Sequence, residues 1–495
     1  MRRHEYFHIR KVRRTYDRAR NTFSFNISYS TAVALTPRTS AVAEAFGLGV
    51  DEEHRFTVLD AELKINPADI VYVTGDSGSG KSVLLRAIKK DLGNIAVDIA
   101  DMQVPQDKPL IETVGQTVEE GLELLAKVGL GDAFLFLRSY DQLSDGQKYR
   151  YRLAKLLESN KQWWILDEFA ATLDRDTAKI VAFNLQKLAR QQGKAVLAAT
   201  THMDLLEDLH PSVHVHKRFG KEITIKYFPN EPAEECSVVK EMRVEEGSTK
   251  DWRILASFHY RNHRITAPRK IFCLKRGDEL CGVIVYCYPP SASFGRRLVL
   301  PRMSMRELNE KLSVISRVVV HPKYRTVGLG VKLVKETLAL AGTDYVEMSA
   351  VMAKYNPFAE KAGMKKIVEQ QAPKEAQKII GVLESVGFNT ELLGSTNYVS
   401  KMLQTLNEEG ITKIREALSM QRHPRFLKSF SNDLPFGTRS AYQNQMANAS
   451  LEKLASLIKI CGFLMQTKVY LFWKASPGNS QHRRASAKNG RWSSD

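Results

Sequence analysis

Residues 75–82, GDSGSGKS, combine glycines, a lysine and a serine at the spacing of a loop that binds nucleotide phosphates. The loop fits the pattern G-x-x-x-x-G-K-[ST] and follows DIVYVT, which predicts a buried strand. Its glycines permit a tight backbone that points N–H groups at phosphates, Lys81 is placed to reach the β- and γ-phosphates, and Ser82 is placed to bind Mg²⁺. The predicted ATP-binding residues of this loop are Gly75, Asp76, Ser77, Gly78, Ser79, Gly80, Lys81 and Ser82.

Two acids end a second predicted strand, WWILDE at residues 163–168. Asp167 suits a place beside Mg²⁺, and Glu168 suits a base that polarises the water attacking the γ-phosphate. The loop and these acids together predict Mg²⁺-dependent hydrolysis of ATP.

Four further segments make the chain resemble the ABC ATPase family. They are VPQDKPLIETV (104–114), LSDGQ (143–147), TLD (172–174) and TTHMD (200–204). In the family's order they are similar to its Q-loop, its LSGGQ signature, its D-loop and its switch-histidine segment. Asp145 replaces one glycine of the signature.

The ABC resemblance implies roles for individual residues. The resemblance implies that Gln106 is a catalytic sensor of Mg²⁺ and water, and that it is a metal ligand together with Ser82 and Asp167. It implies that His202 is a catalytic residue that contacts the γ-phosphate. Further ATP contacts are implied for Ser144, Gly146, Gln147 and Asp174. An aromatic residue is expected to stack on adenine, and Phe56 is the candidate, with a plain core strand residue as the alternative.

The resemblance also implies a partner. In the family, two ATPase domains enclose two ATP molecules, each held between the nucleotide loop of one domain and the signature loop of the other. This chain has one set of motifs, so a homodimer through the ABC domains, or a partner ATPase, is implied.

A second phosphate-binding pattern lies at residues 321–333, HPKYRTVGLGVKL. It follows VISRVVV, a β-branched run that predicts a buried strand, and it leads into a predicted helix. Backbone N–H groups at the start of such a helix bind pyrophosphate through their geometry and the helix dipole. The pattern R-x-x-G-x-G alone is weakly specific.

This region resembles the GNAT acetyltransferase superfamily. The segments VVVHPKYRTVGLGVKLVKETL and YVEMSAVMAKYNPFAEKAGM are similar to the strand, loop and helix that bind acetyl-CoA and to the strand and helix that follow. The resemblance implies a site for acetyl-CoA, or another acyl-CoA, at Val318, Val319, Val320, Arg325, Thr326, Val327, Gly328, Leu329, Gly330 and Asn356. A second mononucleotide site or an unliganded α/β domain is the alternative.

The catalytic groups of the GNAT pattern are altered here. Ala359 stands where the family has a tyrosine acid, and Ser316 and Arg317 stand where its usual acidic base lies. Tyr355 is a substitute acid or a packing residue, and Glu347 is a substitute base or a surface acid.

A basic, aromatic stretch, FHYRNHRITAPRKIF at residues 258–272, predicts a nucleic-acid contact. Aromatic rings stack on bases and guanidinium groups hold phosphates, so the predicted residues are His259, Tyr260, Arg261, His263, Arg264 and Arg269. A solvated basic loop is the alternative. The formal charge of +18 favours a polyanionic partner such as tRNA or DNA, and the HYR segment is faintly similar to phage Mom DNA-modification proteins.

The elements that carry these motifs predict an α/β fold in consecutive parts. We expect a P-loop ABC ATPase domain, a GNAT-like mixed α/β domain and a mainly helical C-terminal region. The predicted boundaries are 1–55 for a basic N-terminal region, 56–230 for the ATPase, 238–370 for the GNAT-like domain, 371–475 for the helical region and 476–495 for a disordered basic tail.

The rest of the composition bears on the cellular setting. The longest apolar runs are too short to span a membrane, so no membrane insertion is expected. Five scattered cysteines without C-x-x-C spacing favour a reducing cytosol, and therefore a cytoplasmic protein.

Three functions follow as hypotheses. The chain as a whole resembles archaeal-type proteins in which an ABC ATPase is fused to a predicted acetyltransferase, which implies an ATPase with N-acetyltransferase activity on a tRNA or DNA base. The second hypothesis is an ABC ATPase whose GNAT-like domain is inactive and only binds nucleic acid or a ligand. The third is the ATPase of a membrane transporter.

Overall fold

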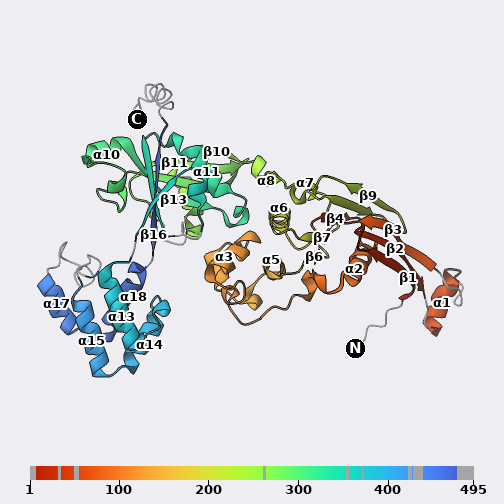
Figure 1. Cartoon of the computed structure of the whole chain (residues 1–495), viewed down its shortest axis with the longest axis horizontal. Helices are drawn as coiled ribbons and strands as arrows, with labels where there is room; N and C mark the ends of the chain where they lie inside the picture. The colour runs from red at the N-terminus through yellow and green to blue at the C-terminus, as the bar shows by residue number, and fades with distance from the viewer. Residues whose placement is uncertain are drawn as a thin grey trace. The chain divides into compact units, whose positions relative to one another are not determined.

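The computed structural model describes residues 7–31, 35–48, 55–259, 264–351, 356–370, 372–421, 426, 439–465 and 467–476 (Figure 1). The chain forms two compact units, each discontinuous in sequence. Unit 1 comprises Met1–Arg264, Ile271–Ile284 and Arg317–Leu333, and unit 2 comprises Ile265–Lys270, Val285–Ser316 and Val334–Asp495. The loop at 321–328 therefore belongs to the same unit as the predicted ATPase.

A six-stranded sheet forms the centre of unit 1, in the order β5-β6-β7-β4-β8-β9. The strands are β4 (Ile70–Thr74), β5 (Ala96–Asp98), β6 (Trp163–Leu166), β7 (Ala195–Ala199), β8 (Val213–Lys217) and β9 (Ile223–Tyr227). Strand β9 is antiparallel to β8, and the other neighbours are parallel. Every residue of β4, β6 and β7 is buried, as expected for parallel strands covered on both faces.

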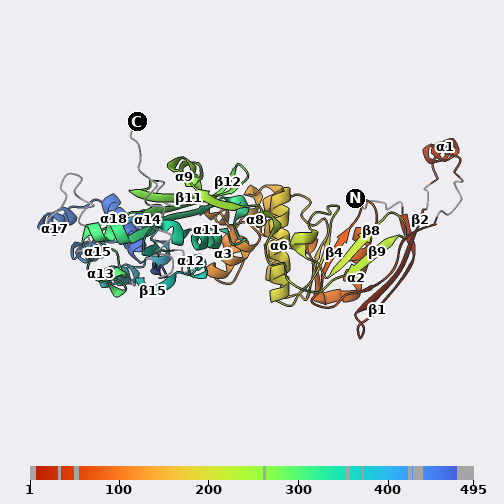
Figure 2. The same ribbon diagram turned by 90° about the horizontal axis from the view of Figure 1, so that it is seen from above.

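Helices cover both faces of this sheet (Figures 1 and 2). They are α2 (Lys81–Leu92), α3 (Val118–Lys127), α4 (Ala133–Phe136), α5 (Asp145–Glu158), α6 (Arg175–Gln191) and α7 (Leu206–Leu209). Side chains alternate along a strand, so Tyr72 packs with the core that includes α5 and α6, while Val71 and Val73 pack with the core that includes α2. The two adjoining cores position the ends of β4 and β6, where the predicted nucleotide residues begin.

A three-stranded antiparallel sheet adds to this part of the chain. It consists of β1 (Phe7–Asp17), β2 (Thr22–Thr31) and β3 (Arg55–Lys64), and a helix, α1 (Pro37–Ala45), lies between β2 and β3 in sequence. Phe23 and Leu59 of this sheet are buried in the same core as α2. The predicted boundary at residue 56 divides this sheet, because β1 pairs with β2 and β2 pairs with β3, so residues 7–31 belong with residues 55–64.

A seven-stranded sheet follows, in the order β10-β11-β12-β13-β14-β16-β15. The strands are β10 (Arg243–Glu246), β11 (Pro268–Arg276), β12 (Glu279–Cys287), β13 (Leu312–Val320), β14 (Tyr345–Ala350), β15 (Lys365–Gln370) and β16 (Lys468–Lys474). The predicted turn at 276–278 connects β11 to β12, with Gly277 at a positive φ of 57°. Strands β13 and β14 are parallel and pair at Leu312–Val314 and Tyr345–Glu347.

Five short helices accompany this sheet in sequence. They are α8 (Ser237–Lys240), α9 (Thr249–Leu255), α10 (Met305–Lys311), α11 (Leu329–Thr337) and α12 (Phe358–Lys361). Helix α11 begins inside the predicted pyrophosphate pattern, as the sequence indicates.

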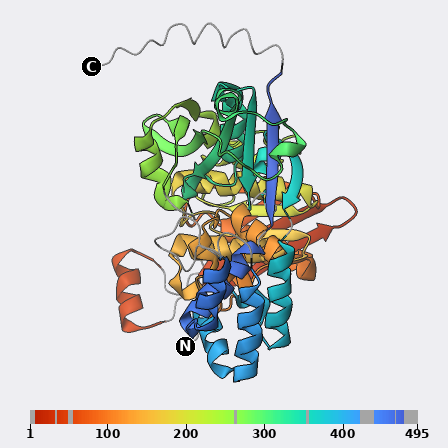
Figure 3. The same ribbon diagram turned by 90° about the vertical axis from the view of Figure 1, so that its left-hand side faces the viewer.

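The helical region of unit 2 consists of α13 (Lys374–Ser385), α14 (Thr396–Thr405), α15 (Glu408–Ser419), α17 (Arg439–Ala447) and α18 (Leu451–Leu464). Ile379 and Leu383 of the predicted apolar face are buried in its core, and Gly387 follows α13 at a φ of 91°. Figure 3 shows these helices, in blue, gathered in one bundle.

Strand β16 corrects the predicted boundary at residue 370. It pairs antiparallel with both β14 and β15, so the chain leaves the sheet after β15, forms the helices and returns (Figure 3). Residues 468–474 thus complete the seven-stranded sheet instead of ending a helical region. The predicted disordered tail lies almost entirely outside the described residues.

Candidate functional site

The loop between β4 and α2 has the geometry that a phosphate-binding loop requires. Gly75, Gly78 and Gly80 have φ angles of 140°, 77° and 101°. A Cβ atom at Gly75 would lie 1.9 Å from the Lys217 carbonyl oxygen, and one at Gly80 would lie 2.6 Å from Val58 Cγ1. Only glycine fits both positions, because the backbone approaches its neighbours too closely for any side chain.

Lys81 folds back over this loop. Its Nζ donates to the carbonyl oxygens of Gly75 at 2.8 Å and Asp76 at 2.7 Å. Burial lowers the pKa of Lys81, and the carboxylates of Asp167, Asp76 and Glu168 oppose that effect. The lysine therefore lies in the electrostatic reach of the two acids at the end of β6, as the predicted site requires.

An aromatic hollow of about 430 Å³ adjoins the loop. It is lined by Tyr29, Phe56, Val58, Gly78, Gly80, Val83 and Phe219. The ring centroids of Phe56 and Phe219 are 5.1 Å apart, and the two residues are 41% and 69% exposed. A planar base between or over these rings would remove apolar surface from water.

Phe56 was expected here, whereas Tyr29 and Phe219 were missed. Tyr29 lies on β2 and Phe219 lies in the turn between β8 and β9. Neither is near the loop in sequence, and the only signal for them is their aromatic type.

The two acids after β6 stand in a tight turn. Glu168 has a φ of 54° and Ala170 a φ of 57°, the left-handed region that non-glycine residues rarely adopt. The backbone N–H of Glu168 donates to Asp167 Oδ1 at 3.1 Å, and that of Ala170 donates to the Tyr149 hydroxyl at 3.1 Å. Such backbone strain costs on the order of 1–3 kcal/mol and clusters at functional sites.

A hollow of about 350 Å³ lies in front of these acids. Asp167 and Glu168 line it together with Asp145 and Lys148 of the first turns of α5. The Glu168 carboxylate is exposed and available to a water molecule.

The signature and D-loop segments are helix caps that pack together. Ser144 caps α5. The Gln147 N–H donates to the Ser144 hydroxyl at 3.4 Å, and the Ser144 N–H donates to Gln147 Oε1 at 3.0 Å. Asp174 caps α6 by accepting from the Thr177 N–H at 3.1 Å. A Cβ atom at Gly146 would lie 3.4 Å from the Thr172 carbonyl oxygen. The glycine therefore lets the signature segment pack closely against the D-loop segment.

The remaining ATPase candidates occupy separate loops. Gln106 is exposed and donates to the Val104 carbonyl at 3.0 Å. The carbonyl of His202 accepts from the Tyr72 hydroxyl at 2.5 Å, and its N–H donates to the Thr200 hydroxyl at 3.3 Å. Burial, and then the charge of Arg175, lower the pKa of the His202 imidazole, so it is neutral near pH 7.

The described residues contain no group of three or more His, Cys, Asp or Glu side chains placed to hold a metal ion. The predicted Mg²⁺ residues Ser82, Gln106 and Asp167 include only one carboxylate and are not a group of this kind. In such a site the nucleotide phosphates complete the coordination.

The loop at 321–328 makes contacts that the sequence does not predict. Arg325 Nη1 donates to the Gly131 carbonyl at 2.6 Å, Nε to the Val320 carbonyl at 3.0 Å and Nη2 to the Phe258 carbonyl at 3.4 Å. Burial lowers the pKa of this guanidinium, and the carboxylate of Asp132 opposes that effect. Arg325 therefore holds three backbone carbonyls in this structure, and its contact to a pyrophosphate stays a prediction.

The other residues predicted to bind acyl-CoA lie at the end of β13, in this loop, at the start of α11 and at Asn356. Thr326, Val327 and Gly328 precede α11, and Gly328 is exposed at a φ of 85° with open space at its Cβ position. Leu329 is buried and anchors the helix start. Among the predicted strand residues Val319 is buried, and Val318 and Val320 are half-buried, while Gly330 is half-buried and Asn356 exposed.

Glu347 is the centre of a buried cluster in unit 2. Its oxygens accept from Arg296 Nη2 at 2.6 Å and Nε at 2.9 Å and from the Tyr470 hydroxyl at 2.8 Å. Glu347 is 2% exposed, which overturns the view of it as a surface acid. The base role stays an untested prediction, and the ion pair argues against it because a base needs free access to its proton donor.

Arg296 and Tyr470 were missed because they lie 51 and 123 residues from Glu347 in the chain. Burial and the Glu347 carboxylate both raise the pKa of Tyr470, which keeps its hydroxyl protonated and donating. The predicted acid Tyr355 lies outside the described residues, and Ala359 is buried.

The predicted nucleic-acid residues are only partly described. His259 lies edge-on to Trp252, with ring centroids 6.1 Å apart, and Arg264 is exposed. Arg269 lies over the ring of Tyr288 at 5.1 Å, and burial lowers the pKa of its guanidinium. Tyr260, Arg261 and His263 lie outside the described residues.

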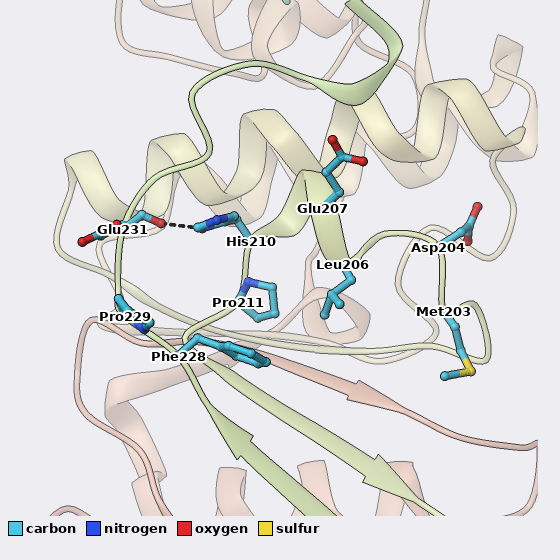
Figure 4. A pocket seen from close by; sticks show the side chains of 9 residues that line it. All are labelled: Met203, Asp204, Leu206, Glu207, His210, Pro211, Phe228, Pro229 and Glu231. Atoms are coloured by element: carbon cyan, nitrogen blue, oxygen red, sulfur yellow. Dashed lines mark hydrogen bonds between the residues drawn. The ribbon is translucent and has the colours of Figure 1, made fainter. Parts of the chain in front are cut away.

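One larger hollow, of about 660 Å³, contains none of the predicted site residues (Figure 4). It is lined by Met203, Asp204, Leu206, Glu207, His210, Pro211, Phe228, Pro229 and Glu231. The His210 ring is held by the Glu231 carbonyl at 2.8 Å. The hollow begins directly after His202 in sequence, but its lining is mainly apolar.

Protein-family models match both halves of the chain. The ABC transporter model matches residues 58–171, and the Acetyltransferase (GNAT) family model matches residues 237–363. The ABC match covers the nucleotide loop, the acids after β6 and strands β4, β5 and β6, and the GNAT match covers strands β10 to β14.

Curated relatives match the ATPase half. The cytochrome c biogenesis ATP-binding export protein CcmA of Colwellia psychrerythraea is 30% identical over an alignment of 200 residues, and the match covers 34% of this chain and 88% of that protein. The methionine import ATP-binding protein MetN of Rhizobium etli is 27% identical over an alignment of 227 residues, and the match covers 38% of this chain and 63% of that protein. The chain thus spans less than two thirds of that MetN.

A solved ATP-binding cassette, a dimer bound to ADP and Pi in a post-hydrolysis state, aligns with 36% of this chain and 93% of its own. The sequence identity is 18% and the TM-score 0.30. The chain belongs to the family of ABC ATP-binding proteins and carries a GNAT acetyltransferase domain in the same polypeptide.

Proposed function

We propose that this protein hydrolyses ATP and transfers an acyl group from acyl-CoA to a base of tRNA or DNA. The observation that carries the proposal is the presence, in one chain, of a complete nucleotide loop with an exposed Glu168 and of a GNAT loop that opens helix α11.

The ATPase part of the proposal assigns each described residue a task. The N–H groups of residues 75–82 and Lys81 bind the phosphates, and Ser82, Gln106 and Asp167 hold Mg²⁺. Glu168 polarises the attacking water, and the neutral His202 contacts the γ-phosphate. Phe56, with Phe219 beside it, covers the adenine.

The acyl-transfer part uses the main chain of β13 and the start of α11. The last three residues of β13, Val318–Val320, bind the pantetheine arm, and the N–H groups at Gly328–Gly330 bind the pyrophosphate. An amine nitrogen of the acceptor attacks the thioester carbon and forms the new C–N bond, the C–S bond breaks, the nitrogen loses a proton to water, and the coenzyme thiolate takes up a proton. Tyr355 is the proposed acid for that proton.

A nucleic-acid acceptor is supported by charge. The whole chain carries +18, and the β1–β2 hairpin exposes Lys11, Arg13, Arg18 and Arg20. Basic side chains along a strand and its turn suit a phosphate backbone.

The acyl transfer is tested with acetyl-CoA labelled in the acetyl group. Purified protein, ATP, Mg²⁺ and either total tRNA or duplex DNA are incubated, and the label in the nucleic acid is counted. Nucleoside mass spectrometry then identifies the modified base. Label in neither nucleic acid, while acetyl-CoA binding persists, would contradict the acyltransferase and favour a ligand-binding GNAT domain. Ala359 and the ion-paired Glu347 are the observations that support that second candidate.

A transport role is the third candidate, supported by relatives that are named as import and export ATP-binding proteins. Within the described part of the chain, no helix is both long and apolar enough to cross a membrane. Fractionation of cells separates this candidate from the others, because a transporter ATPase is recovered with membranes through its partner.

A further inference from the structure

The acyl-CoA loop and the nucleotide-responsive loops of the ATPase share direct contacts within unit 1. Asp176 is the second residue of α6 and follows the D-loop residue Asp174 closely. Lys323 Nζ lies 2.6 Å from Asp176 Oδ2, Arg276 Nη1 lies 2.8 Å from Asp176 Oδ1, and the Tyr324 hydroxyl oxygen lies 3.3 Å from Oδ2. One carboxylate thus receives two charged donors from the GNAT segment.

The environment of Asp176 makes this a firm contact. Its side chain is 16% exposed, so solvent screens the pairs less than at an open surface. Burial alone would raise the pKa of Asp176, but hydrogen bonds from Lys323 and Arg276 hold it below its usual value. Tyr324 is fully buried and also donates to Glu279 Oε2 at 2.7 Å, which fixes the ring that carries the contact.

A second connection leads to the signature helix. Arg325 binds the Gly131 carbonyl, and Asn184 Nδ2 of α6 donates to the Thr326 hydroxyl at 2.8 Å. Two residues before Gly131, the Gly129 carbonyl accepts from Arg150 Nη1 at 2.8 Å, and Arg150 Nε donates to the Gly146 carbonyl at 3.2 Å. Arg150 therefore connects the signature loop to the segment that holds Arg325.

These contacts hold the loop at residues 321–328 against the ATPase segments, with Arg325 turned toward backbone carbonyls and not toward a pyrophosphate. Arg325 uses all three guanidinium nitrogens on backbone carbonyls. Thr326 has a φ of 80°, a left-handed conformation that is strained for a non-glycine residue. Release of the contacts would relieve this strain and free the guanidinium.

We infer that the D-loop and signature segments control the acyl-CoA loop, so that closure of the ATP-bound dimer releases Arg325 and strengthens acyl-CoA binding. The inference rests on the proposed function, because it takes the two ligands from there. By linkage, acyl-CoA strengthens ATP binding by the same factor. Asp176 is a positioning residue in this scheme, since it touches neither ligand.

The test is calorimetric titration of the full chain with acetyl-CoA, with and without saturating ATP and Mg²⁺, using Glu168→Gln to prevent hydrolysis. We expect the acetyl-CoA affinity to rise between about 5- and 150-fold when ATP is bound, the usual range of coupling between sites. The substitution Asp176→Asn, made in addition to Glu168→Gln, keeps the size of the side chain and removes its charge. It should give tight acetyl-CoA binding without ATP, so that the ratio of the acetyl-CoA affinities with and without ATP falls to near one.

A matched control is Asp101→Asn. It removes an ion pair of the same length, 2.6 Å to Lys89, elsewhere in unit 1. This variant should keep the full ATP effect. Thermal melts of both variants check that each remains folded.

The outcomes separate the inference from the proposed function. If ATP changes the acetyl-CoA affinity by less than twofold, or weakens it, the coupling is overturned, while the donor site stays in place. An ATP effect that Asp176→Asn does not reduce overturns the route through Asp176. Absence of acetyl-CoA binding in every state overturns the donor assignment itself, and with it the coupling.

Discussion

At the scale of single residues, the two phosphate loops of the chain differ in what they offer. The loop at 75–82 supplies a lysine and a hydroxyl near two carboxylates, which suits a phosphate chain that reacts. The loop at 321–330 supplies backbone N–H groups and an arginine, with no acid pair of its own. A pyrophosphate bound there would be an anchor.

The anchoring role predicts the effect of one substitution. Gly328→Glu places bulk and a negative charge at an exposed, left-handed position of the loop, so acetyl-CoA affinity should fall at least tenfold through repulsion of the pyrophosphate. Titration calorimetry measures the loss. Gly277→Glu is the matched control, because it adds the same charge at a φ of 57° in the β11–β12 turn, also with open space at the Cβ position. Equal loss in both variants would point to a general effect of charge or strain.

The predicted residues of the nucleotide loop are contiguous in sequence. Gly75–Ser82 work through one loop, so their spacing alone specifies the geometry. Phe219 and Tyr29 reach the same site from distant strands, and Arg296 and Tyr470 meet Glu347 across the chain. No local sequence pattern encodes these long-range contacts, because they depend on the tertiary fold as well as on the type of each side chain.

At the scale of elements, the buried cluster of Arg296, Glu347 and Tyr470 pins β16 against β14. Glu347 lies on β14 and Tyr470 on β16, and their strands pair directly. The resemblance to the GNAT superfamily predicted β14, but β16 follows a long helical stretch and shows no sign of its sheet partners. Its place depends on burial available only in the folded sheet.

Removal of the arginine tests this role of the cluster. Arg296→Met leaves the Glu347 carboxylate buried without its ion pair, which should lower the free energy of unfolding by about 3–5 kcal/mol. Urea unfolding followed by circular dichroism gives that value. The exposed ion pair of Arg306 and Glu310 offers a comparison. Arg306→Met should change the free energy of unfolding by less than about 1 kcal/mol. Similar small effects for both variants would show that the cluster does not stabilise the sheet.

At the scale of the whole molecule, the chain carries one nucleotide loop and one signature loop. The hollow beside Phe56 and the hollow beside Glu168 and Asp145 are lined by different residues. An enclosed ATP would then take its second wall from another copy, as the family resemblance implies.

Arrest of hydrolysis should reveal that second copy. Glu168→Gln removes the base and is expected to accumulate an ATP-bound dimer, seen as a doubling of the mass in light scattering after gel filtration. The double variant with Lys81→Ala, which loses the main phosphate contact, should stay monomeric in ATP. A monomer for Glu168→Gln at saturating ATP would contradict the proposed enclosure of ATP between two copies.

The position of β16 has a consequence for how the protein is made. During synthesis β14 and β15 emerge long before β16, yet β16 separates them in the finished sheet. Until residues 468–474 leave the ribosome, both strands expose edges whose N–H and C=O groups have no neighbour. Helices α13, α14, α15, α17 and α18 emerge in that interval, so a nascent chain holds open strand edges while residues 371–467 are added. Such an intermediate is prone to wrong pairing, and chaperone protection would matter most during this stage.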